Sequence, residues 1–364
     1  AGLDRPGGWV DMTRAIRSPG SSLKPFIYGL AFDDGVAAPD TILDDAPRRF
    51  ADYQPENFDR VFHGRVSARE ALANSLNVPA VEVLEKLDPA AFEARMTAAG
   101  VRLIRPRTKE KAPGLALALG GVGLSLRDLA MLYAALGDSG VAKPLAWTED
   151  EASRRLRERG RRLMRPEAAR QVLDILRETP PPAGSTPGAL TRGRPLMAYK
   201  TGTSYGFRDA IAAGVVGRYA VVVWTGRADG GARGGVTGRD SALPLLFDVA
   251  DLLDAPPAAP RPLAPRSAPA ALQTLPGPAD DGPRLIFPPD KATVRVEGFG
   301  AAARGLVLAA GGENLSWYVD GQPLDRDGVS GRVVWKPRGP GFYRIDVVDG
   351  QGRRVTARVR IRGG

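Results

Sequence analysis

The sequence has 364 residues, of which 43% are hydrophobic and 25% are charged, enough for two globular domains of roughly 150 residues each. It contains no cysteine and a single histidine, His63, which excludes cysteine nucleophiles, disulfide scaffolds and the common zinc sites, and leaves one histidine for any Ser-His-Asp triad. The formal net charge of +10 is spread along the chain, so we expect no nucleic-acid partner but a loose attraction to an anionic polymer or lipid surface.

The hydrophobic pattern of residues 1–255 predicts a first domain that mixes helices and strands. Apolar residues recur with helical spacing in some segments and form short strand-like runs in others. Helices are predicted over 67–76, 79–87, 89–99, 125–137, 166–177 and 241–254, and strands over 196–203, 210–216 and 219–225. This pattern favours an α/β (α+β) class.

A proline- and alanine-rich segment, 256–282, separates this region from the C-terminal one. Its first part, 256–278, holds eight prolines and almost no large apolar side chains, which predicts a stiff, extended linker. Residues 283–364 read as short strands separated by turns. An Asp-Gly pair inside 317–324 predicts a hairpin, and 333–361 predicts three further strands. We expect a small all-β, immunoglobulin-like sandwich.

Three short motifs in the first domain indicate chemistry. They are SxxK at Ser21 and Lys24, SxN at Ser75 and Asn77, and KTGTS at 200–204. With 14 Ser, 8 Lys and 4 Asn in the chain, chance expects the three motifs together roughly 0.004 times, before order and spacing are required. We therefore interpret them as parts of one site.

The spacing of the first motif predicts a nucleophile and its base. Ser21 and Lys24 are three residues apart, so they share one face of a helix, and the preceding Pro-Gly places Ser21 in its first turn. A serine hydroxyl needs a base to become nucleophilic, and a neutral lysine is the available base. Burial and a nearby cation lower the pKa of lysine, and Lys200 is the cation that we expect.

The other motifs supply groups that handle protons and substrate. We expect Ser75 to relay a proton between Lys24 and a leaving amine, and Asn77 to hydrogen-bond a substrate amide. The string KTGTS reads as an edge strand on which a substrate backbone can pair, with Gly202 allowing a close approach.

A carboxylate and an oxyanion are the charges that this site would bind. We expect Lys200, Thr201 and Thr203 to hold a substrate carboxylate, and the backbone N–H groups of Ser21 and Thr203 to form an oxyanion hole. No metal and no cofactor is expected.

These motifs together resemble the penicillin-recognising serine acyltransferases. The flanking strings SPGSSLKPFIYGLAFDDG (18–35), YQPENFDRVFHGRVSAREALANSLNVPAV (53–81), LALGGVGLSLRDLAMLYAAL (117–136) and KTGTSYGFRDA (200–210) are similar to class A penicillin-binding proteins. GFRDA and the C-terminal sandwich are most similar to the penicillin-binding protein 1C branch of that family. The resemblance covers about residues 8–362.

The resemblance implies a penicillin-binding/serine β-lactamase-like transpeptidase fold and a peptidoglycan D,D-transpeptidase. In such an enzyme Ser21 is acylated by the D-Ala-D-Ala end of a stem peptide, an amine of a neighbouring stem resolves the acyl-enzyme, and β-lactams acylate Ser21. The implied location is the bacterial periplasm, at the outer face of the cytoplasmic membrane. The implied partners of the sandwich are a bacterial macroglobulin-like protein or other cell-wall enzymes.

The sequence departs from the family in three places. The membrane anchor and the glycosyltransferase domain of the bifunctional family are not in it. Only 20 residues precede Ser21, so we expect the first strands of the transpeptidase domain to be lacking. Ile211 stands where an aromatic residue is usual.

Two other functions stay open. One is a hydrolase on the same scaffold, a D,D-carboxypeptidase or a β-lactamase, which needs a base that activates water. Asp209 is a candidate for that base, although a turn cap or an ion pair with Arg208 or another neighbour is the more ordinary role. The other is a cell-wall scaffold or sensor that binds without catalysis.

Other conspicuous residues have ordinary structural explanations. We expect His63 to be a structural or surface residue. Trp317 and Tyr318 are expected in the sandwich core, with a ligand platform as the alternative. The arginines between 154 and 165 are expected on a solvated face, with an anionic polymer or lipid as the alternative partner.

Overall fold

The computed structural model describes most of the chain: residues 7–50, 53–105, 114–155, 160–181, 196–255, 283–296, 298–300, 305–311, 314–325 and 333–363. The chain forms two compact units, the first of residues 1–45, 57–59 and 64–275, and the second of 46–56, 60–63 and 276–364. The predicted linker, 256–282, lies outside the described residues, and the predicted domain limits stay a prediction.

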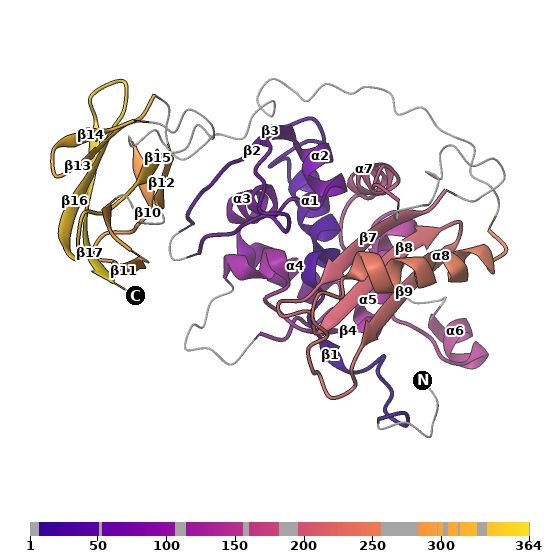
Figure 1. Ribbon diagram of the computed structural model, residues 1–364. Coiled ribbons are helices and arrows are strands. Elements are labelled where there is room, and N and C mark those ends of the chain that lie inside the picture. Colours follow the sequence, from indigo (N-terminus) through magenta and orange to yellow (C-terminus); the bar gives the residue numbers. More distant parts are fainter. Residues whose placement is uncertain are drawn as a thin grey trace. The chain divides into compact units, whose positions relative to one another are not determined.

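The first unit mixes helices with short sheets, as predicted (Figure 1). Its helices are α1 (Lys24–Asp33), α2 (Ala68–Ala73), α3 (Asn77–Leu87), α4 (Pro89–Ala98), α5 (Leu126–Gly137), α6 (Glu149–Arg155), α7 (Pro166–Leu176) and α8 (Leu243–Asp251). Its strands are β1 (Ile16–Arg17), β2 (Ile42–Asp45), β3 (Gly64–Ser67), β4 (Leu124–Ser125), β5 (Val141–Ala142), β6 (Arg161–Arg162), β7 (Ala198–Thr203), β8 (Asp209–Val216) and β9 (Tyr219–Gly226).

An antiparallel sheet of β7, β8 and β9 lies between two helices. Ala212 and Val216 of β8 pack with residues of α8 in one apolar cluster. Val215 alternates to the other face, where it approaches Gly137 of α5. In Figure 1, α8 crosses one face of the sheet and α5 lies on the other. In the described residues β7 is an edge strand of this sheet, as its motif predicted.

Helix α1 is buried along its whole length. Its sequence, KPFIYGLAFD, is apolar on nearly every side, as expected for a helix enclosed by others. The rings of Phe26 and Tyr133 meet edge to face, with centroids 5.4 Å apart, and the Tyr133 hydroxyl donates to the carbonyl of Ser22 at 3.0 Å. These contacts fix the segment in which the SxxK motif lies.

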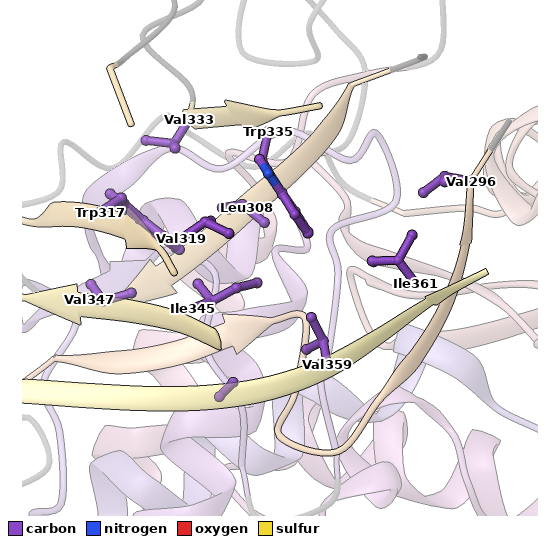
Figure 2. Packing of buried hydrophobic residues seen from close by; sticks show 11 residues of the cluster. Val296, Leu308, Trp317, Val319, Val333, Trp335, Ile345, Val347, Val359 and Ile361 are labelled. Atoms are coloured by element: carbon purple, nitrogen blue, oxygen red, sulfur yellow. The ribbon is translucent and has the colours of Figure 1, made fainter. Parts of the chain in front are cut away.

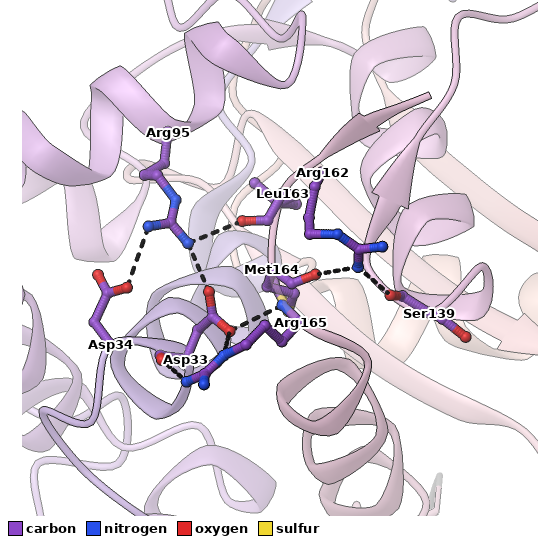
Figure 3. A network of polar contacts seen from close by, with 8 residues as sticks. All are labelled: Asp33, Asp34, Arg95, Ser139, Arg162, Leu163, Met164 and Arg165. Atoms are coloured by element: carbon purple, nitrogen blue, oxygen red, sulfur yellow. Dashed lines mark hydrogen bonds and ion pairs between the residues drawn. The ribbon is translucent and has the colours of Figure 1, made fainter. Parts of the chain in front are cut away.

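A buried carboxylate fastens the far end of α1 (Figure 3). Asp33 accepts hydrogen bonds from the backbone N–H and Nε of Arg165, at 2.9 and 2.8 Å, and pairs with Arg95 at 2.7 Å. Burial alone would raise the pKa of Asp33, but these hydrogen bonds outweigh it and lower the pKa. Arg165 therefore has a structural partner, although it is exposed, as expected for its arginine-rich segment.

Two predicted helices differ from the observed ones at their ends. The helix predicted over 67–76 begins with a capping box of Ser67 and Glu70 but ends at Ala73, because Ser75 adopts a φ of 61°. The helix predicted over 241–254 is a π-helical turn, Gly238–Ala242, that continues into α8. The remaining predicted helices and strands agree with the structure to within about two residues at each end.

The second unit contains a β-sandwich. One sheet has the order β10 (Arg284–Phe287), β12 (Leu306–Gly311), β15 (Val333–Trp335). The other has the order β11 (Thr293–Val296), β17 (Arg354–Gly363), β16 (Gly341–Val348), β13 (Ser316–Val319), β14 (Gln322–Leu324). The predicted hairpin is β13–β14, and its Asp320 and Gly321 have φ values of 47° and 81°, as a tight turn of this kind requires.

Alternate residues of both sheets fill the space between them (Figure 2). The cluster comprises Val296, Leu308, Trp317, Val319, Val333, Trp335, Ile345, Val347, Ala357, Val359 and Ile361. Trp317 is 5% exposed, so its predicted place in the core is confirmed, whereas Tyr318 alternates to the other face of β13 and is not part of this cluster.

Candidate active site

Ser21 lies in a 3₁₀ turn, Gly20–Leu23, that leads directly into α1. Two glycines bring this turn against β7. A Cβ on Gly20, which has a φ of +52°, would lie 2.5 Å from the carbonyl oxygen of Thr203, and a Cβ on Gly202 would collide with the carbonyl oxygen of Pro19. The serine turn and the KTG strand therefore touch backbone to backbone, which only glycine permits.

Lys24 is completely buried and its amine points to the turn between α2 and α3. The Nζ atom donates hydrogen bonds to the carbonyl oxygens of Ser75 and Leu76, at 2.7 and 2.9 Å, and to Oδ1 of Asn77, at 2.7 Å. A charged ammonium group has three N–H groups and can donate to all three acceptors. A neutral amine has only two N–H groups, so it donates to two of the acceptors, and its lone pair is then available to take a proton.

Ser75 joins the two lysines of the site. Its carbonyl accepts from Lys24, and its hydroxyl accepts from Lys200 Nζ at 2.7 Å. Its left-handed φ of 61° costs a serine about 1–3 kcal/mol. Such strain is characteristic of functional sites. Here it occurs in a turn that lets Ser75 accept hydrogen bonds from both Lys24 and Lys200.

Burial and a neighbouring cation disfavour the charged form of each lysine. The pKa of Lys24 is lowered well below its ordinary value, first by burial and then by the charge of Lys200, against a smaller opposing effect of Asp45. The pKa of Lys200 is lowered to about 7, by burial and then by Arg239. Near neutral pH, a small change in the surroundings of Lys200 can therefore decide whether its amine holds a proton.

The edge of β7 offers backbone groups to a bound molecule. Ser204 N–H donates to the Asp209 carbonyl at 2.9 Å, which makes this a hydrogen-bonded pair of β7 and β8. In an antiparallel ladder, hydrogen-bonded pairs alternate with pairs that are not hydrogen-bonded to each other. The N–H and C=O groups of Thr203 and Thr201 therefore point away from β8. Thr203 Oγ1 accepts from Gly238 N–H at 2.9 Å, which leaves its own hydrogen available for a ligand.

A family model described as "Penicillin binding protein transpeptidase domain" matches residues 9–229. The chain belongs to this family. A second model, described as "Penicillin-Binding Protein C-terminus Family", matches residues 274–361 of this penicillin-binding protein.

Relatives and solved structures agree with this assignment. The chain is 47% identical over 246 residues to penicillin-binding protein 1C of Escherichia coli (strain K12), which covers 68% of this chain and 31% of the relative. It is 31% identical over 259 residues to penicillin-binding protein 1B of Vibrio cholerae, covering 61% of this chain and 30% of the relative. The chain thus spans about a third of the length of these curated relatives.

One similar solved structure is PonA1 of Mycobacterium tuberculosis in complex with penicillin V, with a TM-score of 0.56 at 21% identity, covering 74% of this chain and 77% of that one. Another is penicillin-binding protein 1A of Haemophilus influenzae, with a TM-score of 0.54 at 21% identity, covering 69% and 44% of the two chains. At this identity the likeness shows the fold alone.

The predicted family and fold class are confirmed, since penicillin-binding protein 1C is among the similar relatives and the transpeptidase fold is shared. The structure also brings the three motifs of this penicillin-binding protein together: Lys24 contacts Ser75 and Asn77, Lys200 contacts Ser75 and Thr201, and the turn of Ser21 meets Gly202 and Thr203. The roles of these residues stay predictions.

Sequence reasoning missed a buried polar chain behind Asn77. The backbone N–H of Asn77 donates to Oδ1 of Asn57 at 2.7 Å, and Nδ2 of Asn57 donates to both carboxylate oxygens of Asp45, at 2.9 and 2.7 Å. Asp45 is fully buried and Asn57 is 4% exposed. A polar residue in a loop 20 positions before Asn77 carries no periodic signal, so only the folded structure shows this connection.

Asp209 makes structural contacts at the start of β8. Its Oδ1 accepts from Trp224 Nε1 at 2.9 Å and lies 3.9 Å from Arg17 Nε, and its backbone N–H donates to Ser204 Oγ at 2.8 Å. Arg17 in turn lies over the Trp224 ring, 5.2 Å from its centroid. The carboxylate therefore has the structural role expected of it, although its ionic partner is Arg17 and not the adjacent Arg208.

Proposed function

We propose that this protein is a peptidoglycan D,D-transpeptidase that forms an acyl-enzyme on Ser21. The observation that carries the proposal is the position of Ser75, which bonds to Lys24 through its carbonyl and to Lys200 through its hydroxyl, beside the turn that holds Ser21. Its membership of the transpeptidase family supports the same reaction.

In the first step, neutral Lys24 takes the hydrogen of the Ser21 hydroxyl while Oγ attacks the carbonyl carbon between the two D-Ala residues. This forms a C–O bond and a tetrahedral oxyanion, which the N–H groups of Ser21 and Thr203 stabilise. Lys24 becomes an ammonium. The lowered pKa of Lys24 supports the role of base, because burial and Lys200 keep a neutral fraction available.

In the second step, the C–N bond breaks and D-Ala leaves as an amine. Its nitrogen receives the Ser75 hydroxyl hydrogen, and Ser75 recovers a proton from the Lys24 ammonium, so the base is neutral again. An amine of a second stem peptide then attacks the ester, the reverse relay removes its proton, and Ser21 is released. A β-lactam enters the same first step, but its leaving nitrogen stays tethered to the acyl group.

Lys200, Thr201 and Thr203 would hold the terminal carboxylate, and Asn77 a substrate amide. The free hydrogen of the Thr203 hydroxyl and the outward backbone of β7 support this assignment. A bound carboxylate favours the protonated form of Lys200, which then repels a proton from Lys24. Substrate arrival would therefore help to prepare the base.

The location and partners follow from the proposed reaction. We place the protein in the bacterial periplasm at the outer face of the cytoplasmic membrane, where peptidoglycan stem peptides are cross-linked. None of the helices in the described residues is both long and apolar enough to cross a bilayer. A macroglobulin-like protein or another cell-wall enzyme remains a predicted partner of the sandwich.

Intact-mass spectrometry after exposure to benzylpenicillin tests the nucleophile. We expect one adduct of the mass of the intact antibiotic, and none in Ser21→Ala, while Ser22→Ala, a matched neighbour in the same turn, keeps it. Adduct formation in Ser21→Ala would refute the assignment. An adduct on the unaltered protein that disappears within seconds would favour a β-lactamase, whereas one that lasts for hours supports the transpeptidase.

A further inference from the structure

The outer face of the five-stranded sheet in the second unit is dense in arginine. Along β17 the residues alternate between core and solvent, and the solvent positions include Arg358, Arg360 and Arg362. We call these three, together with Arg295 of β11 and Arg344 of β16, the arginine face. All five side chains belong to exposed residues.

The strand register spreads these cations over three neighbouring strands. Arg362 lies beside Arg295, since β11 pairs with β17 in that register. Arg358 lies beside Arg344, since β16 pairs with β17 on the other side. Adjacent strands are about 4.8 Å apart and alternate residues on one strand about 6.7 Å apart. The result is a two-dimensional array of charge and not a single row.

Few carboxylates pair with the guanidinium groups of this array, although Asp290 and Asp320 accept the backbone N–H groups of Arg358 and Arg344, each at 2.8 Å. Among the residues that the structure describes, Arg295, Arg358, Arg360 and Arg362 have no carboxylate within ion-pair distance. Asp346 lies on the same face, but Arg344 and Arg354 hold it at 3.1 and 2.8 Å. Like charges directly opposite one another, such as Arg295 and Arg362, destabilise a sheet. The arrangement costs stability unless an anion relieves it.

An exposed aromatic ring stands beside the arginines of β17, at the start of the neighbouring strand β16. Phe342 of β16 is 77% exposed, although phenylalanine is normally buried. It lies opposite Arg360 in the register, and the Arg360 guanidinium stands over its ring, 5.4 Å from the centroid. Cations around an exposed apolar ring are the combination that binds the headgroup region of an anionic bilayer.

We propose that the arginine face, with Phe342, binds the surface of an anionic phospholipid bilayer. The guanidinium groups pair with lipid phosphates, and Phe342 enters the boundary between headgroups and acyl chains. An array of cations spread over three strands fits a membrane surface better than a linear polyanion, which is ordinarily bound along a groove or a single row of cations. This contact is separate from the chemistry at Ser21 and does not depend on it.

Co-sedimentation of the full chain with vesicles tests the proposal. Vesicles of phosphatidylcholine and phosphatidylglycerol in equal parts should bind the protein, and vesicles of phosphatidylcholine alone should not. The triple variant Arg358→Gln, Arg360→Gln, Arg362→Gln should reduce the partition coefficient roughly a hundredfold, from the contribution of each cation near an anionic surface. Phe342→Ala should reduce it with the charge unchanged. Raised salt should weaken binding.

A charge-matched control is available in the first unit. Arg154, Arg170 and Arg218 are exposed there, and changing all three to glutamine removes the same charge. This control should bind nearly as well as the unaltered protein. Labelling of Ser21 by a fluorescent penicillin shows that the first unit of each variant is folded, and thermal unfolding followed by circular dichroism shows whether the sandwich is folded as well.

Three outcomes would overturn the proposal. Equal loss in the triple variant and in the control would mean that net charge alone attracts the protein. Equal binding to neutral vesicles would exclude phosphate recognition. Arginine-dependent binding to a soluble polyanion such as polyphosphate, without binding to vesicles, would assign the face to a polymer instead.

Discussion

The two lysines of the active site and the arginines of the C-terminal sheet carry the same charge in opposite surroundings. Lys24 and Lys200 are at most 1% exposed, and the pKa of each is lowered by burial. The arginine face is open to solvent, and guanidinium groups stay charged there at any physiological pH. Burial therefore makes a cation responsive to its neighbours and suited to proton transfer, whereas exposure keeps its charge constant and suited to attraction.

Removing the buried base should have the largest effect. Lys24→Met keeps much of the side-chain volume but has no lone pair for the Ser21 proton, so we expect acylation by a fluorescent penicillin to slow by about 10²–10⁴-fold. Lys86→Met, the same change at an exposed lysine of α3, should leave the rate unchanged. Labelling of a folded Lys24→Met variant at the normal rate would show that another group accepts the proton.

The pH dependence of acylation should distinguish the two lysines. Lys24 must be neutral, so the rate rises with pH at the acid end. Lys200 must be charged to attract the penicillin carboxylate, and its pKa is about 7 in the free protein. The second-order rate constant should therefore fall above about pH 7, by roughly tenfold per pH unit at the alkaline end.

A variant of Arg239 tests why the rate constant falls at alkaline pH. Burial is the larger cause of the lowered pKa of Lys200, and the charge of Arg239 is the second. Arg239→Gln should therefore raise this pKa and move the fall in rate to higher pH. Arg218→Gln, an equal loss of charge at the turn between β8 and β9, should leave the pH profile in place. An unchanged pH profile in Arg239→Gln would show that Lys200 is not the group whose titration lowers the rate constant at alkaline pH.

Breaking the polar chain behind Asn77 should slow acylation less than the loss of Lys24 does, but more than a substitution at a surface residue. Asn57→Ala removes the acceptor of the Asn77 N–H and the donor to Asp45, so we expect unfolding to need about 1–3 kcal/mol less and acylation to slow. Asn74→Ala, at an exposed asparagine of the same region, should change neither quantity measurably. Equal effects in both variants would deny Asn57 a positioning role.

The sequence predicted many of the helices and strands of both units, because each has a local signal. Pro166 opens α7, a short run of mostly apolar residues marks β8, which is buried along its whole length, and Asp320-Gly321 forms the hairpin turn. The SxxK, SxN and KTGTS motifs were recognisable as short sequence patterns, and their chemical roles were predicted from the types of residue in them.

Other features depend on distant contacts and could not be read locally. The left-handed Ser75, which ends α2 early, is stabilised by lysines 51 and 125 positions away. The pairing of Asn57 with Asp45 follows from burial in the folded chain. The arginine face needed a strand register, because β11 joins β17 in parallel and brings together residues that are far apart in sequence.

The smallest expected effect is that of pH on vesicle binding, and it distinguishes the exposed arginines from the buried lysines. Between pH 6 and pH 9, penicillin labelling should change strongly, because the pKa of Lys200 is about 7, whereas vesicle binding should change less than about twofold, because a guanidinium keeps its charge over this range. Both quantities can be measured on one preparation across one set of buffers of constant ionic strength. A parallel pH dependence of labelling and vesicle binding would mean that a common group controls both, and the distinction between responsive and constant cations would fail.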